Sequence, residues 1–272
     1  MTARWTLPLR LRSDAAHQYD ELGYLLLGSL MPPAAVERAR AELDRMLFQL
    51  NPEIRPDEIY SAHQQERWLL ELAVSDDLLD AVEQVIGSDI VLWSTHLICK
   101  PPRTGRAIPW HQDGTYWNVV GRMVSVWLAL DDVDRENGTM YVLPRWHKQV
   151  FGRRPTGDEF FDEEIQPDAL PKNIEQQQVE YRFKAGEAGM HHVLIPHSSP
   201  PNLSSTRWRR VLVIRYMSAD GEMGAKQYPD YRTNELFDRQ YILVRGRDVK
   251  CRGLIGVDEF LSALSVSQTD RV

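Results

Sequence analysis

Residues 90–98 read IVLWSTHLI, and from this segment onward the sequence loses its helical periodicity. Apolar and β-branched side chains dominate the segment, as is typical of a buried strand. Similar β-rich runs cover residues 123–130, 139–143, 179–183, 190–195 and 211–217. An Asn137-Gly138 pair between two of these runs predicts a hairpin-type turn. A sheet-dominated body is therefore expected over residues 89–250 or thereabouts.

Helical patterns precede this body. The clearest covers residues 75–86, where Ser75 is placed to cap the helix and Gly87 to end it. A second covers 33–50 with a proline in its first turn, and a third covers 14–22, followed by an apolar strand over 24–27. Helices beside two antiparallel sheets predict an α+β fold. The expected core is a double-stranded β-helix, the cupin-like jelly-roll, in one domain spanning 1–272 with its helical part at about 1–88.

Composition narrows the possible partners and compartment. The chain has 272 residues, 43% of them hydrophobic, and 32 basic against 39 acidic residues give a net charge of −7. That charge argues against nucleic acid or an anionic membrane as a partner, because both favour a basic face. Cys99 and Cys251 are the only cysteines, which predicts reduced thiols rather than a disulfide framework. No run of 18 apolar residues occurs, so a cytoplasmic protein is expected.

The segment His111-Gln112-Asp113 supplies the first candidate metal ligands. About one His-x-Asp/Glu match is expected by chance in this composition, so the context of the segment matters. On a strand, His111 and Asp113 would leave the same face of the sheet while Gln112 points away. Aromatic residues flank the segment, which disfavours a bare solvent loop.

Three histidines compete to be the next ligand. Strand alternation would place one of His191 and His192 inside the sheet body and the other outside. His197 instead follows a proline at the strand end and precedes a Ser/Pro/Asn turn, from which it could reach a barrel mouth. We favour His197, with His192 in reserve. Two histidines and one carboxylate on one face of a metal are the ligand set of a non-haem Fe(II) oxygenase.

Three arginines, Arg207, Arg209 and Arg210, open the last strong strand. A solvent-exposed strand end would account for most of them. One inward-facing guanidinium would suit a dicarboxylate co-substrate, because it pairs bidentately with a carboxylate. If Arg209 faces inward, so do Val211 and Val213, while Arg210 faces outward.

Several segments, in their order and spacing across most of the chain, resemble the phytanoyl-CoA dioxygenase family of Fe(II)/2-oxoglutarate oxygenases. They are Gly23-Tyr24-Leu25, Lys100-Pro101-Pro102, the His-Gln-Asp segment, 127–132 (WLALDD), 136–138 (ENG), 197–202 (HSSPPN), Arg209 and Arg215-Tyr216. The resemblance implies that His111, Asp113 and His197 bind iron. It places Arg209 at the far carboxylate of 2-oxoglutarate, in preference to Arg207 and Arg210. Residues implied near the co-substrate are Lys100, Gln112, Trp127 and Ser199.

The same resemblance implies hydroxylation of a small organic molecule with O2, releasing succinate and CO2. It leaves the substrate and the oligomeric state undefined. Candidate substrate contacts are the aromatic residues Trp110, Tyr116, Trp117 and Trp146, for an apolar or cationic group, and Arg122 and Arg145, for an anion. The family commonly has Pro-Gly-Ser-His where this chain has Pro144-Arg145-Trp146-His147, which bears on the size of the substrate. The polar stretch 153–178 is expected to be an insertion loop that could act as a lid.

Two other functions fit the same ligands. One is a cupin-like zinc or manganese protein that hydrolyses or isomerises its substrate without 2-oxoglutarate. The other is a non-catalytic binding protein that has kept the fold. Binding of 2-oxoglutarate that depends on Fe(II) would distinguish the oxygenase from both.

Overall fold

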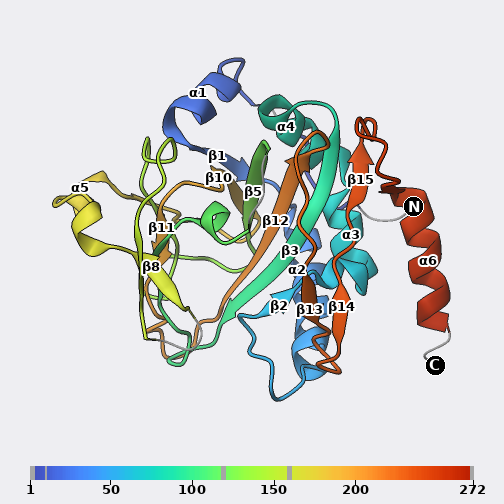
Figure 1. The fold of residues 1–272 in the computed structure, drawn as a ribbon. Coiled ribbons are helices and arrows are strands. Elements are labelled where there is room, and N and C mark those ends of the chain that lie inside the picture. Colours follow the sequence, from blue (N-terminus) through green and yellow to red (C-terminus); the bar gives the residue numbers. More distant parts are fainter. Residues whose placement is uncertain (1–3, 10, 118–120, 158–160, 270–272) are drawn as a thin grey trace.

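The computed structural model describes residues 4–269 except 10, 118–120 and 158–160, without the side chains of 266–269. Its α-helices are α1 (Ala15–Leu22), α2 (Pro33–Phe48), α3 (Arg67–Ala73), α4 (Asp76–Ile86), α5 (Ile174–Gln177) and α6 (Val257–Thr269) (Figure 1). Short 3-10 turns are η1 (Ala62–Gln64), η2 (Asp113–Thr115) and η3 (Pro167–Ala169). No helix in this described part of the chain is long and apolar enough to cross a membrane.

A large, mostly antiparallel sheet forms the centre of the molecule. Its order is β1 (Tyr24–Ser29), β10 (Glu187–His192), β5 (Met123–Ala129), β12 (Arg209–Ser218), β3 (Ile90–Lys100), β15 (Ile242–Arg245) and β16 (Ile255–Gly256), and β2 (Ile59–Tyr60) also pairs with β3. A smaller sheet has the order β4 (Ile108–His111), β11 (His197–Ser199), β6 (Tyr141–Val142) and β9 (Val179–Glu180). Two hairpins complete the strands, β7 (Arg153–Pro155) with β8 (Glu163–Ile165) and β13 (Gln227–Pro229) with β14 (Leu236–Asp238).

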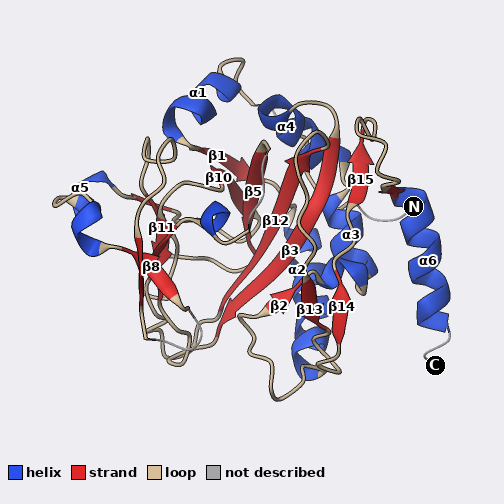
Figure 2. Ribbon diagram, viewed as in Figure 1, coloured by secondary structure: helices blue, strands red, loops and turns tan. Residues whose placement is uncertain are grey.

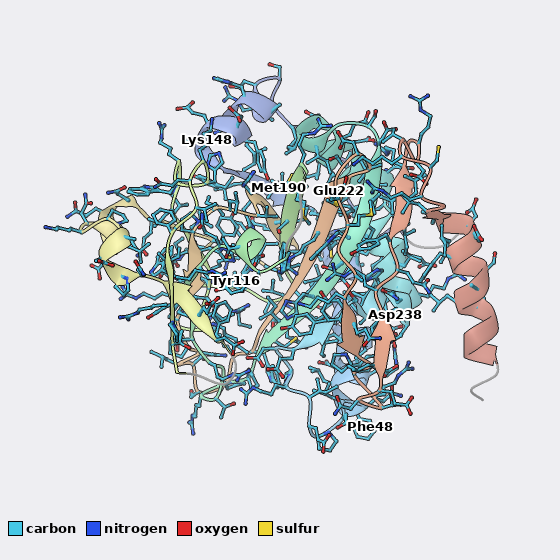
Figure 3. The ribbon with its side chains drawn as sticks, viewed as in Figure 1. Phe48, Tyr116, Lys148, Met190, Glu222 and Asp238 are labelled. Carbon is cyan, nitrogen blue, oxygen red and sulfur yellow. The ribbon has the colours of Figure 1, made fainter. Side chains whose placement is uncertain are left out.

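The two faces of the large sheet bury different partners. Alternate residues of β5, such as Val124 and Val126, join the core formed with the N-terminal helices, whereas Trp127 belongs to a cluster shared with the smaller sheet. This division follows from the two-residue period of a strand. In Figure 2 the helices α2 and α3 lie behind the large sheet, and the smaller sheet stands beside it. Tyr116 lies in the region between them, while the exposed Phe48 lies at the periphery (Figure 3).

The N-terminal helices match the sequence pattern closely. α1, α2 and α4 form at the expected positions, and Gly23 ends α1 in the left-handed conformation, with φ of 80°. The capping expectation was wrong, because the Ser75 hydroxyl donates to the carbonyl oxygen of Leu72 at 2.8 Å instead of accepting from α4. The start of α4 is instead stabilised by Asp76 and Asp77, whose negative charges interact favourably with the positive end of the helix dipole.

The hairpin predicted at Asn137-Gly138 was also wrong. β5 and β6 on either side belong to different sheets, so the connection crosses between sheets. Asn137 stabilises this crossing, since its Nδ2 donates to the carbonyl oxygens of Asp132 at 2.9 Å and Trp208 at 3.1 Å. Gly138 has φ of 85°, and a Cβ there would lie 2.7 Å from the Pro200 oxygen.

The stretch 153–178 is more structured than an insertion loop. It contains the β7–β8 hairpin, η3 and α5, and residues 158–160 lie outside the described part. The strand expected over 190–195 also differs, because β10 ends at His192 and the chain turns before β11. The turn is closed by the Ile195 amide, which donates to the His192 oxygen at 2.9 Å, and by the Leu194 amide, which donates to His192 Nδ1 at 3.0 Å.

Candidate active site

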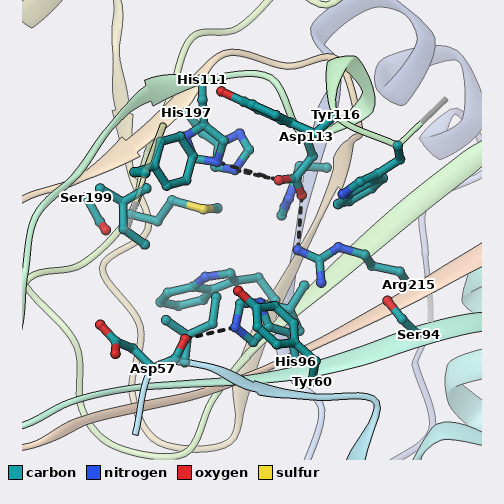
Figure 4. A pocket seen from close by; sticks show the side chains of 18 of the residues that line it. Asp57, Tyr60, Ser94, His96, His111, Asp113, Tyr116, His197, Ser199 and Arg215 are labelled. Atoms are coloured by element: carbon teal, nitrogen blue, oxygen red, sulfur yellow. Dashed lines mark hydrogen bonds and ion pairs between the residues drawn. The ribbon is translucent and has the colours of Figure 1, made fainter. Parts of the chain in front are cut away.

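A cavity of about 380 Å³ lies between the two sheets. β3, β5 and β12 of the large sheet supply one wall, and β4 and β11 of the smaller sheet supply the other. In Figure 4, His111, His197 and Asp113 lie on one side of this cavity, and His96 and Tyr60 lie on the opposite side. The cavity therefore brings together segments that are distant in the sequence.

The three candidate metal ligands converge in this cavity. His111 and His197 are directly paired across β4 and β11, and their ring centroids are 4.0 Å apart. Asp113 opens η2 rather than extending β4, but the extended Gln112 before it keeps its carboxylate beside His111. The Nε2 atoms of His111 and His197 lie 3.5 and 3.9 Å from Asp113 Oδ1. One ligand atom from each residue lies within 4.8 Å of the others, which is the arrangement a single metal ion requires.

Backbone carbonyls orient both imidazoles for metal binding. His111 Nδ1 donates to the Pro109 oxygen at 2.8 Å, and His197 Nδ1 donates to the Ile195 oxygen at 2.9 Å. A carbonyl only accepts, so each Nδ1 carries the proton and each Nε2 presents a lone pair to the cavity. Burial lowers the pKa of His197 to about 4, which keeps this imidazole neutral. The donor set thus fits a divalent transition metal.

Arg215 lies against Asp113, a role at the metal site that was not expected from the sequence. Its Nη2 donates to Asp113 Oδ2 at 3.1 Å, and its guanidinium lies 4.7 Å from the Trp117 ring centroid. Burial raises the pKa of the Asp113 carboxyl, but Arg215 and the two histidines outweigh it and hold the pKa well below its usual range. The sequence could have indicated this position, because strand alternation places Arg215 on the same face of β12 as Arg209.

Of the three arginines at the start of β12, Arg209 faces the cavity. It is 1% exposed, its Nε donates to the Gly138 oxygen at 3.1 Å, and burial lowers its pKa to about 10. Arg207 instead binds Asp134 and Glu136, and Arg210 binds Asp131 and Asp44. No Asp or Glu among the described residues forms an ion pair with Arg209, so it is the arginine with a positive charge to offer a cavity ligand.

The other residues implied near the co-substrate divide into two groups. Trp127 and Ser199 line the cavity, and the Arg209 guanidinium lies 5.8 Å from the Trp127 ring centroid. Lys100 is fully buried behind them, where Nζ donates to Ser199 Oγ at 2.6 Å and to the Pro200 oxygen at 2.7 Å. It fixes the strand end that carries His197 instead of touching the cavity itself.

The reserve ligand does not reach the site. His191 lines the cavity with its ring centroid 5.3 Å from that of His197, whereas His192 faces away and lies 5.1 Å from the His147 ring. The alternation expected for these two neighbours is confirmed.

Gln112 lies outside the cavity, which corrects its expected position near the co-substrate. Its Nε2 donates to the oxygens of Gln149 at 2.8 Å and Leu194 at 2.6 Å, and its Oε1 accepts from the Phe151 amide at 3.0 Å. The side chain therefore joins the η2 segment to two neighbouring loops.

We expect Gln112→Ala to lower the free energy of unfolding by about 2 kcal/mol. The backbone groups of Gln149, Leu194 and Phe151 would lose their hydrogen-bond partner, and hydrogen bonds to water would replace the lost bonds only in part. Urea denaturation of the metal-free protein measures the change. Gln176→Ala, at an exposed position, is the matched control and should stay within about 0.5 kcal/mol of the parent. Equal stability of the two variants would contradict this role.

Four of the six expected substrate residues lie outside the cavity. Tyr116 and Trp117 line the cavity, as predicted, but Trp110 leaves the opposite face of β4 from His111. The remaining three do not line the cavity either: Arg122 pairs with Asp220 at 3.8 Å, Arg145 pairs with Glu21 at 3.0 Å, and the Trp146 Nε1 donates to Gln177 at 3.3 Å.

Other lining residues were missed. Ser94, His96 and Ile98 of β3 alternate into the cavity, a pattern that the strand period could have indicated. Tyr60 and Tyr228 come from segments with no local signal. Phe161, in the 153–178 stretch, also lines the cavity, and its ring centroid lies 4.6 Å from that of His111.

The family model named phytanoyl-CoA dioxygenase (PhyH) matches residues 19–211. The chain is 27% identical over 231 residues to the "probable alpha-ketoglutarate-dependent hypophosphite dioxygenase" of Stutzerimonas stutzeri, covering 83% of this chain and 77% of that protein. It is 27% identical over 229 residues to the L-proline trans-4-hydroxylase of Streptomyces griseoviridis, covering 75% and 85%. Among solved structures, apo ThoJ, a non-heme monooxygenase, superposes with a TM-score of 0.71 at 25% identity, covering 93% of this chain and 96% of that one. Since the family model spans more than half of the sequence, the chain belongs to the phytanoyl-CoA dioxygenase family.

Proposed function

We propose that this protein is an Fe(II)- and 2-oxoglutarate-dependent dioxygenase that hydroxylates an unactivated C–H bond of a small organic molecule. The observation that carries the proposal is the meeting of two features in one cavity. One is the His111, Asp113 and His197 triad, and the other is the buried Arg209, which pairs with no described carboxylate. A metal alone would explain the triad, but a dicarboxylate co-substrate explains both.

In this assignment His111, Asp113 and His197 would hold the iron, and the far carboxylate of 2-oxoglutarate would pair with the Arg209 guanidinium. Iron and the keto acid, when bound, would supply the oxidising chemistry, with succinate and CO2 as by-products. Arg215 keeps Asp113 ionised and aimed at the metal, and Lys100 fixes the strand that carries His197.

The relatives support the reaction class. Two of them are named as an alpha-ketoglutarate-dependent dioxygenase and a trans-4-hydroxylase, and the matches to both cover three quarters or more of each protein. Their names point to different small molecules, so the class carries over to this chain while the individual substrate does not.

The finer architecture belongs to the same proposal. The large and small sheets, with the cavity between them, support a double-stranded β-helix within a single domain that spans 1–272. The contact between Phe161 and His111 supports a lid role for part of the 153–178 stretch, which would exclude water from the reacting centre.

An anaerobic titration of the metal-free protein with Fe(II) and 2-oxoglutarate tests the proposal. The expected result is the visible charge-transfer band of a chelated keto acid, formed only when both components are present. Iron binding without this band would overturn the use of 2-oxoglutarate and would favour a cupin-like metal protein.

A further inference from the structure

Two groups of packed rings line one part of the cavity. Tyr60 stacks on His96 at 4.1 Å and on Tyr228 at 5.2 Å between ring centroids, and Trp93 packs on Trp117 at 4.6 Å. All five residues line the cavity, and we call them the aromatic collar. They come from β2, β3, β13 and the segment after η2, so separate parts of the chain build one structure.

Three cations are interleaved with the collar. Arg239 lies over the Trp93 ring at 3.6 Å and donates to the Tyr228 hydroxyl, so it bridges the two halves of the collar. Lys226 lines the cavity with Nζ 5.4 Å from the Tyr228 ring centroid. Arg215, which donates to Asp113 of the metal triad, lies 4.7 Å from the Trp117 ring centroid.

Carboxylates do not balance this charge. Arg215 is paired with Asp113, but neither Lys226 nor Arg239 forms an ion pair with an Asp or Glu in the part of the chain that is described. Of the other acidic residues that line the cavity, Asp57 is paired with Arg55 and Arg106. Asp162, which is exposed, lies on the hairpin that carries Phe161.

The Lys226 side chain is exposed to solvent, yet its pKa is shifted where it lines the cavity. Burial, and then the positive charges of Arg239 and Arg215, lower the pKa of its ammonium group. A group destabilised by neighbouring cations gains most from an added anion, because the anion interacts favourably with all of them. A negatively charged ligand group would therefore offset the repulsion.

We propose that the collar is a second anion subsite, in which Lys226 and the Arg239-polarised Tyr228 hydroxyl bind an oxyanion of the primary substrate, such as a carboxylate, phosphate or sulfonate. This inference rests on the proposed function only in calling the ligand a substrate. The aromatic rings would cover the organic part of the molecule that carries the anion. The substrate would then present its other end to the metal triad.

The subsite is distinct from the one at Arg209. Tyr228 stacks on Tyr60, which pairs with His96 of β3. His96 in turn pairs with Val213, four residues along β12 from Arg209, or about 13 Å at the usual rise of a strand. Lys226 and Tyr228 therefore lie in a different part of the cavity from Arg209.

Calorimetry with three probes of matched shape tests the subsite. The probes are benzenesulfonate, neutral methyl phenyl sulfone and cationic phenyltrimethylammonium, each added anaerobically to the protein saturated with Fe(II) and 2-oxoglutarate. Saturation occupies Arg209, so a sulfonate must bind elsewhere. We expect benzenesulfonate to bind about tenfold more tightly than the neutral sulfone, the effect of one charge-assisted contact.

Lys226→Met should remove this preference, weakening benzenesulfonate about tenfold with little change for the sulfone. Lys172→Met removes the same charge from an exposed position outside the cavity and should leave all three affinities unchanged. Equal affinity for sulfonate and sulfone, or unchanged sulfonate affinity in Lys226→Met, would overturn the subsite. Tighter binding of the ammonium probe would also overturn it and would assign the collar to a cationic group.

The keto-acid band separates this proposal from the broader one. If the band forms but Lys226 is irrelevant to the sulfonate, the dioxygenase proposal stands and the subsite falls. If no band forms, the comparison of Lys226→Met with Lys172→Met in the metal-free protein still decides whether the collar binds anions.

Discussion

Replacing Asp113 with alanine is expected to weaken Fe(II) binding more than about 100-fold and to abolish turnover of 2-oxoglutarate. Loss of an outer partner of a metal ligand alone costs about 10- to 100-fold in metal affinity or activity, so loss of the ligand itself should cost more. Asp113 is the one carboxylate within reach of both His111 and His197 in the described cluster. Equilibrium dialysis with Fe(II) and an assay for succinate measure the two effects.

Stability must be separated from metal binding in this experiment. Asp113→Ala also leaves Arg215 buried without its partner, and breaking a buried ion pair in this way costs about 3–5 kcal/mol. Asp113→Asn keeps a hydrogen-bond acceptor for Arg215 but not the charge, so it should fold better and still bind iron poorly. Asp162→Ala, which removes a carboxylate from the same cavity but outside the triad, should retain the iron affinity of the parent. Parental iron affinity in both Asp113 variants would contradict the ligand assignment.

Part of the metal triad could be predicted because the spacing of His111 and Asp113 is local. His111 and Asp113 are two residues apart in extended chain, and the turn residues before and after His197 indicated a strand end. Pairing of His111 with His197 across β4 and β11 then brings the three groups together. The family resemblance selected Arg209, and alternation along β12 then separates it from Arg210, whose carboxylate partners lie outside the cavity.

The substrate end could not be predicted in the same way. Tyr60 and Tyr228 stack on each other across 168 positions of sequence, because β2 and β13 meet beside the end of the large sheet. No periodic pattern in either segment specifies that contact. Arg122 and Arg145 were expected to receive an anion, but both pair with exposed carboxylates outside the cavity. Sequence alone does not show which cations are already paired at the surface.

Arg209→Ala is expected to raise the KM for 2-oxoglutarate by about 100-fold or more, while Fe(II) affinity stays near that of the parent. Truncating one partner of a buried, hydrogen-bonded charge pair costs about 2–5 kcal/mol, and each 1.4 kcal/mol is a factor of ten. Arg209 is 1% exposed, so water cannot replace the lost contact. Steady-state kinetics with varied 2-oxoglutarate, together with iron dialysis, measure both quantities, and retained iron binding shows that the variant folds.

The neighbouring arginine provides the control that makes this result specific. Arg210→Ala removes an equal charge one position along β12, but its guanidinium points away from the cavity toward Asp131 and Asp44. The KM of this variant for 2-oxoglutarate should therefore remain within about twofold of the parent. A twofold change corresponds to a free-energy change of about 0.5 kcal/mol or less, which is usual for a substitution away from a binding site. A large KM increase in Arg210→Ala and none in Arg209→Ala would show that the co-substrate lies outside this cavity. The reverse pattern would link the buried guanidinium, and not the net charge of the strand end, to recognition of the dicarboxylate.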